Sequence, residues 1–211
     1  MQGMSNPNQL PTEYFRRYDE QADEQFYLFP RLVVHIDDQA IRTLTALLAK
    51  LLPPGGTYLD LMSSWRSHLP DELKPTRVVG LGMNATEMEE NPQLDAYVVH
   101  NLNENPTLSL PTAEFDAAIC TVSVQYMTRP LETFREVNRI LKPGGIFVVS
   151  FSNRCFSTKA VAAWLASTDE QHVELVEYYF SAAGQWSTPE TAKHTPRHAD
   201  PLYAVWARKT I

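Results

Sequence analysis

Two spacings of hydrophobic residues run along this sequence, one typical of amphipathic helices and the other of buried strands. Within residues 37–52 the apolar residues recur every three or four positions, which predicts a helix that Asp37 or Asp38 caps. Helices are likewise predicted over residues 84–90, 130–142, 158–166 and 170–183. Proline or glycine follows three of these helices directly, at Pro53, Pro143 and Gly184, and is expected to end each one.

Short apolar runs lie between the predicted helices. They predict strands over residues 58–62, 77–81, 96–100, 116–123 and 146–151, and two closing strands at 185–188 and 202–207 with a surface loop between them. Strands that alternate with helices form βαβ units, which build parallel sheets. We therefore expect one α/β domain, with a doubly wound, mostly parallel seven-stranded sheet and helices on both faces. Residues 1–55 would form an N-terminal arm and helix covering the rim, and residues 56–211 the core.

Composition narrows the classes of function. The chain is 44% hydrophobic and 20% charged, which is ordinary for a globular protein, and its net charge of -7 disfavours a nucleic-acid partner. Its apolar runs are shorter than the ~20 residues that span a bilayer, and its first ten residues lack the pattern of a signal peptide. We expect a cytoplasmic protein without a membrane partner. Cys120 and Cys155 are expected to be reduced thiols in or near the core.

Two short motifs flank the fourth predicted strand and the helix after it. Phe115-Asp116 opens the strand, and residues 139–145 end the helix with Arg-Ile-Leu-Lys-Pro-Gly-Gly. In combination they resemble the class I S-adenosylmethionine-dependent methyltransferases, most closely the methyltransferase type 11-like branch with its small-molecule enzymes of quinone biosynthesis. The resemblance covers residues 56–151. It implies a Rossmann-like methyltransferase fold, S-adenosyl-L-methionine as cofactor, and methyl transfer to a small-molecule acceptor.

The loops that would hold this cofactor depart from the family pattern. The first loop of the family reads Asp-x-Gly-x-Gly-x-Gly, whereas residues 60–66 read Asp-Leu-Met-Ser-Ser-Trp-Arg, which keeps only the aspartate. The acid that takes the ribose hydroxyls in the family falls at Gly82, and a third acidic position falls near Asn101. The resemblance still implies a cofactor site made of Asp60, Leu61, Met62, Ser63, Ser64, Gly80, Gly82, Met83, Asn84, Asn101, Leu102, Asn103, Thr121, Val122 and Ser123.

Polar and aromatic residues follow the carboxyl ends of the predicted strands. Ligands of open α/β sheets bind beyond these ends, where the strand order reverses. The resemblance further implies that the N-terminal segment around His35 folds over this rim and completes the acceptor site, and plain packing of an arm is the alternative. The acceptor residues expected on this basis are Tyr27, Arg31, Trp65, Tyr126, Asn153 and Arg154. The sequence assigns no catalytic residue and no oligomeric state.

The altered loops leave other functions open. Serine and asparagine side chains can replace carboxylates as hydrogen-bonding partners of a cofactor, or the site has decayed and the domain is a non-catalytic binding module. Residues 80–85 also fit the G-x-G-x-x-G/A fingerprint of NAD(P)-dependent oxidoreductases. That fingerprint belongs after the first strand and is followed about 20 residues later by an acid, where this chain has His100 and Asn101. No metal is expected, because His194 and His198 lack further ligands at metal-binding spacing.

Overall fold

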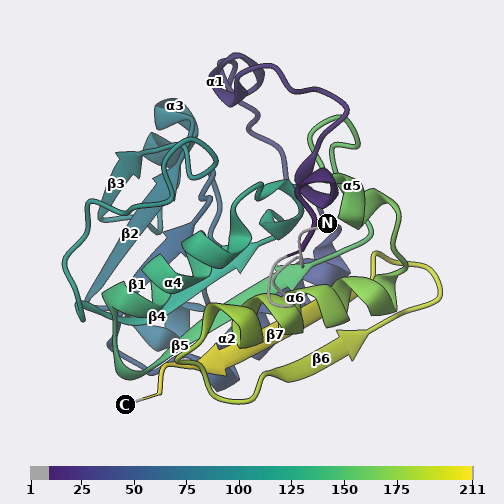
Figure 1. Cartoon of the computed structure of the whole chain (residues 1–211). Coiled ribbons are helices and arrows are strands. Elements are labelled where there is room, and N and C mark those ends of the chain that lie inside the picture. Colours follow the sequence, from purple (N-terminus) through teal and green to yellow (C-terminus); the bar gives the residue numbers. More distant parts are fainter. Residues whose placement is uncertain (1–9, 211) are drawn as a thin grey trace.

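A computed structural model describes residues 10–210 as a sheet of seven strands flanked by helices (Figure 1). The helices are α1 (Asp23–Phe26), α2 (Asp38–Leu51), α3 (Ala85–Glu89), α4 (Pro130–Ile140), α5 (Ala162–Leu165) and α6 (Asp169–Ala183). The strands are β1 (Thr57–Leu61), β2 (Arg77–Gly82), β3 (Ala96–Val99), β4 (Phe115–Thr121), β5 (Leu141–Phe151), β6 (Glu190–His194) and β7 (Leu202–Arg208). The predicted α/β class is confirmed.

The strand order places a crossover beside β1. The order is β3-β2-β1-β4-β5-β7-β6; the pairs among β1 to β5 are parallel, and β7 pairs antiparallel with both β5 and β6. The chain runs outward from β1 to β2 and β3, then returns to the other side of β1 as β4. The loops after β1 and β4 therefore diverge at the carboxyl edge of the sheet, which is where ligands bind in folds of this kind.

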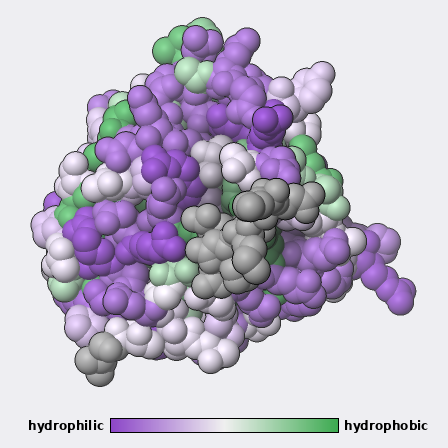
Figure 2. Space-filling model, in the orientation of Figure 1, coloured by the Kyte–Doolittle hydropathy of each residue, from purple (hydrophilic) through white to green (hydrophobic). Residues whose placement is uncertain are grey.

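Each face of the sheet buries alternate residues against its own helices. On the face of α4 and α6, Phe134 and Phe180 lie with ring centroids 4.8 Å apart and pack with Phe147 of β5. On the opposite face, Leu44 and Leu48 of α2 pack with the neighbouring strand positions. The surface over α4 and α6 is mostly hydrophilic in Figure 2, because the apolar sides of these helices face the sheet.

Local sequence signals fix the ends of the long helices. The Asp37 carboxylate accepts the Ala40 N–H at 2.8 Å and caps α2. Thr168 and Gln171 form a capping box at the start of α6, and Gly184, with φ of 77°, follows its last turn. Each device provides partners for backbone groups that a helix end leaves unpaired.

Six predictions of local structure and burial were wrong. Strand β6 lies in the region predicted to be a surface loop, and it pairs with β7. Residues 185–188, predicted to be a strand, form only one isolated bridge, from Trp186 to Lys209. The fifth strand starts at Leu141, ahead of its Pro-Gly-Gly run, and the predicted helix over 158–166 shrinks to the four residues of α5. Helix α2 covers a face of the sheet rather than the rim. Cys155 is exposed, whereas Cys120 is buried as expected.

No helix in the part of the chain that the structure describes is both long and apolar enough to cross a membrane.

Candidate functional site

A cavity of about 200 Å³ opens at the carboxyl edge of the sheet, where the loops after β1 and β4 diverge. Its floor comes from the loops after β1, β2, β3 and β4, and its cover comes from the N-terminal arm, defined here as residues 10–36. A smaller cavity of about 50 Å³ adjoins it, and the two share His35, Met62, Ser63, Ser64, Val122 and Ser123. Ligand sites commonly enclose about 300–1,000 Å³, so the space beneath the arm is small for a cofactor.

Most residues that the sequence singled out lie around these two cavities. The main cavity is lined by the predicted cofactor residues Met62, Ser63, Ser64, Gly82, Met83, Asn84, Asn101, Leu102, Asn103, Val122 and Ser123, and by the predicted acceptor residues Tyr27, Arg31, Tyr126 and Arg154. Asp60, Thr121 and Trp65 border only the smaller cavity. Three positions line neither cavity, namely Leu61, Gly80 and Asn153. Leu61 is buried in the core, Gly80 faces Leu94, and Asn153 is exposed, so the structure places these three outside both cavities.

Asp60 faces inward and holds the loop that follows β1. Its Oδ2 accepts hydrogen bonds from the hydroxyls of Ser63 at 2.7 Å and Ser67 at 2.6 Å. The side chain is buried, and desolvation raises the pKa of Asp60 from 3.8 to about 6 against the opposing effect of these two hydroxyls. These two hydrogen bonds tie residues 60–67 together around the Asp60 carboxylate.

The two central strands each end in a strained backbone. Met62, directly after β1, has φ of 57°, and Val122, directly after β4, has φ of 43°. Non-glycine residues rarely adopt this left-handed conformation, and for a β-branched residue it is a clear outlier. Met62 stands where the methyltransferase pattern has its first glycine, so the loop keeps a backbone that glycine would adopt freely. Such strain concentrates at functional sites, and both residues line the cavity.

Gly82 has no room for the family's ribose-binding acid. A β-carbon built there would lie 2.3 Å from the carbonyl oxygen of Ser63. The nearest carboxylate beyond Gly82 is Glu87 in α3, which is 7% exposed and lines the cavity. Asn84-x-x-Glu87 has the spacing of a helix cap, and the Asn84 side chain accepts the Glu87 N–H at 3.0 Å. Sequence reasoning therefore missed Glu87 as a site residue.

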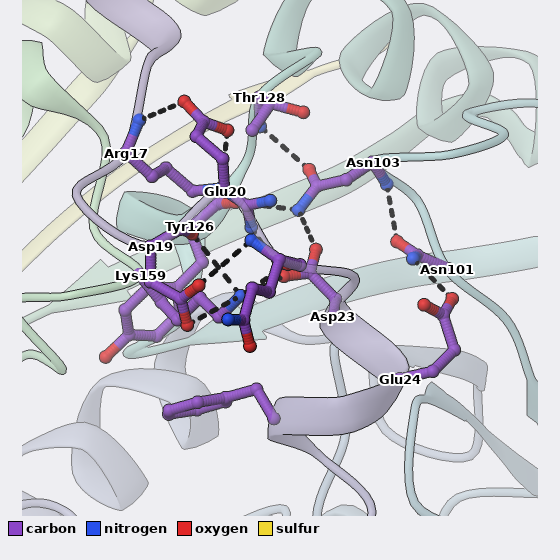
Figure 3. Close-up of polar contacts among 12 residues, drawn as sticks. Arg17, Asp19, Glu20, Asp23, Glu24, Asn101, Asn103, Tyr126, Thr128 and Lys159 are labelled. Atoms are coloured by element: carbon purple, nitrogen blue, oxygen red, sulfur yellow. Dashed lines mark hydrogen bonds and ion pairs between the residues drawn. The ribbon is translucent and has the colours of Figure 1, made fainter.

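A buried charge cluster pins the arm to the rim (Figure 3). Asp23 lies 2.6 Å from Arg17 and 3.3 Å from Lys159, and all three side chains are less than a tenth exposed. Asn103, expected to contact cofactor, instead donates to Asp23 at 2.9 Å and accepts the Thr128 N–H at 2.8 Å. Asn101 donates to Glu24 at 2.7 Å in the same way. The side-chain amides of Asn101 and Asn103 therefore both donate to carboxylates of the arm.

The arm also reaches the mouth of the cavity. The Arg31 guanidinium lies 4.4 Å from the ring centroid of Phe26, and the Arg31 backbone N–H donates to Glu87 at 2.7 Å. The Tyr27 carbonyl accepts the Asn84 side chain at 2.8 Å. Burial lowers the pKa of His35 below its usual 6.5 and raises that of Tyr126 to about 12, so both side chains are neutral at pH 7. These two neutral side chains lie among charged ones, because Arg17, Arg31 and Arg154 and the carboxylates of Asp23 and Glu87 also line the cavity.

The rival cofactor fits less well. In the dinucleotide fingerprint the glycines give a pyrophosphate access to backbone amides. Here Gly80 sits within β2 rather than in a loop, and a β-carbon at that position would lie 2.5 Å from a methyl group of Leu94 and 3.2 Å from the hydroxyl oxygen of Ser63. Within residues 10–210, no group of three or more histidine, cysteine or acidic side chains is placed to hold a metal ion.

The comparisons with known proteins agree with the geometry. A family model described as a methyltransferase domain matches residues 68–149. Among solved structures, the putative methyltransferase bound to the Trm112 activator of Haloferax volcanii is similar with a TM-score of 0.60, at 14% identity over 82% of this chain and 92% of that one. An S-adenosylmethionine-dependent methyltransferase from Mesorhizobium loti has a TM-score of 0.54, at 18% identity over 78% of this chain and 96% of its own.

A third similar structure is named for a different activity. The [4+2]-cyclase SpnF has a TM-score of 0.60, at 17% identity over 89% of this chain and 92% of its own. No curated protein matches the sequence. At these identities the solved structures show the fold. The methyltransferase-domain match covers residues 68–149, the part of the chain that runs from the end of the first loop to β5, and it is consistent with S-adenosylmethionine as cofactor.

Proposed function

We propose that this protein transfers a methyl group from S-adenosylmethionine to a small molecule, and that both bind in the cavity under the arm. The observation that carries the proposal is the pair of left-handed residues, Met62 and Val122, at the ends of β1 and β4. A site that had lost its ligand would have no reason to keep this strain, because a relaxed loop would be more stable. The altered loop sequence therefore supports a re-adapted cofactor site.

The residues around the cavity suit the parts of this cofactor. Ser63, Ser64 and Ser123 line the cavity with hydroxyl oxygens that can accept hydrogen bonds, since their protons are donated to Asp60, Glu87 and the Thr121 carbonyl. Met83 and Leu102 add apolar surface. S-adenosylmethionine, when bound, supplies a methyl group that its sulfonium already activates. The chain then needs to bind, orient and exclude water, and orientation alone contributes up to about 7–11 kcal/mol to a reaction of this kind. No strong base is required for an acceptor that is itself a good nucleophile.

The form of the cavity supports a small acceptor. Arm residues Tyr27, Arg31 and His35 stand over it, and Tyr126 and Arg154 border it from the core. A protein segment or a nucleic acid would need an open groove across this edge, whereas the arm covers it. We infer that the arm shifts only far enough to widen the cavity for the cofactor and a small acceptor.

A labelled-methyl assay tests the acceptor class. The protein is incubated with S-adenosylmethionine carrying a radioactive methyl group and with a cell extract separated into low-mass, protein and nucleic-acid fractions. Label should appear in the low-mass fraction alone. The control is Met83→Trp, a change at a half-buried residue lining the cavity, which should abolish transfer by filling the site. Label in the protein or nucleic-acid fraction would overturn the proposed acceptor class.

A further inference from the structure

The acid that binds the ribose hydroxyls in the family is missing from its usual position in this chain. Gly82 cannot carry one, because the Ser63 carbonyl oxygen fills the space that its side chain would enter. Only two acidic residues of the described chain line the main cavity, Asp23 and Glu87. Asp60 borders the smaller cavity, where its carboxylate is engaged by two serine hydroxyls.

The two candidate acids differ in the number of charged partners that their carboxylates already have. Asp23 faces Arg17 and Lys159, and it also accepts from Asn103. Two cations and an amide leave little of its charge for a ligand. Glu87 has no ion-pair partner within residues 10–210, although it lies among buried groups at 7% exposure. Its charge is the one that remains available at the cavity wall.

Glu87 is held in place at both oxygens by single hydrogen bonds. Its Oε1 accepts the Arg31 N–H at 2.7 Å, and its Oε2 accepts the Ser64 hydroxyl at 2.7 Å. An ionised carboxylate has about four acceptor sites, two on each oxygen. Each oxygen of Glu87 therefore keeps one free acceptor site, which matches a pair of neighbouring hydroxyl donors.

We propose that Glu87 binds the two ribose hydroxyls of the cofactor, in place of the acid that the family carries at the end of β2. The inference rests on the proposed function. It also links the ligand to the arm and to the first loop, because Glu87 contacts Arg31 of the arm and Ser64 of the loop. A cofactor bound to Glu87 would thereby help to order both the arm and the loop after β1.

A binding cycle with two ligands and two proteins tests this assignment. The probes are S-adenosylhomocysteine and its 2′-deoxyribose analogue, titrated by calorimetry into wild type and Glu87→Gln. A hydrogen bond to a charged group changes affinity by about ten- to a hundredfold. Wild type should prefer the ribose form by that factor, and Glu87→Gln should bind both forms with nearly equal, weak affinity. Glu90→Gln, an exposed acid just after the same helix, should behave as wild type.

The outcomes separate this inference from the proposed function. If wild type binds neither probe, the proposed function fails and the assignment of Glu87 fails with it. If wild type prefers ribose and Glu87→Gln keeps that preference, Glu87 is not the ribose acid although the cofactor site stands. Should Glu87→Gln fold poorly, Glu87→Asp replaces it: the shorter acid keeps the charge but should lose the preference for ribose.

Discussion

Adding a side chain at Gly82 should disrupt the loop below the cavity, whichever side chain is chosen. The β-carbon would lie 2.3 Å from the Ser63 carbonyl oxygen, which belongs to a backbone that Asp60 and Ser67 hold in place. Gly80 provides a matched control: its β-carbon would lie 2.5 Å from a terminal methyl group of Leu94, which can rotate away. Gly82→Ala should therefore destabilise the fold more than Gly80→Ala.

Overpacking against a fixed neighbour costs about 1–3 kcal/mol, and in a chain of this size each kcal/mol lowers the melting temperature by about 2–4 °C. Urea unfolding and thermal melting of both alanine variants measure the difference. Gly82→Asp, which rebuilds the family's acid, should lose as much stability as Gly82→Ala and should not bind cofactor more tightly. A stable Gly82→Asp with improved affinity would refute both the steric argument and the role of Glu87.

Two further predictions concern the buried acids. Burial raises the pKa of Asp60 to about 6, so the ionisation of Asp60 favours the unfolded chain. As pH rises from 4 to 7, the unfolding free energy of wild type should fall by about 2–3 kcal/mol relative to that of Asp60→Asn. Urea unfolding of both proteins at the two pH values measures this change, and a difference that does not vary with pH contradicts it. Asp23→Asn leaves the buried Arg17 and Lys159 without their shared carboxylate and should lower the unfolding free energy by about 3–5 kcal/mol. Glu20→Gln, at an exposed position of the arm, should lower it little. Equal losses in the two variants would show that the cluster does not pin the arm.

The sequence predicted the order of the elements because each carries its own local signal. Residues 37–52 show helical periodicity with an aspartate cap, and the structure places α2 within one residue of those bounds. The C-terminal region lacks such signals. Strand β6 reads Glu-Thr-Ala-Lys-His, an exposed edge strand with little hydrophobic alternation, and its pairing with β7 decides its structure. Strand pairing with a distant segment cannot be predicted from a short window of sequence.

The candidate site was predictable where it depends on strand ends and not where it depends on long-range contacts. Met62, Ser63 and Asn84 follow strands, so topology alone brings them to one edge. Asp23 comes from a four-residue helix in the arm and reaches Asn103 across 80 positions of sequence. Glu87 carries a pattern that also suits a helix cap, and only the blocked space at Gly82 distinguishes the two roles. Such facts require coordinates.

Thermal melting with three ligands tests the central claim, that this cavity binds S-adenosylmethionine. A ligand at a hundred times its dissociation constant stabilises a fold by about 2.7 kcal/mol, which corresponds to a rise in melting temperature of about 5–10 °C here. S-adenosylmethionine and S-adenosylhomocysteine should each produce this shift, and NADPH should produce none. A shift with NADPH alone, or no shift with any of the three, would contradict the account.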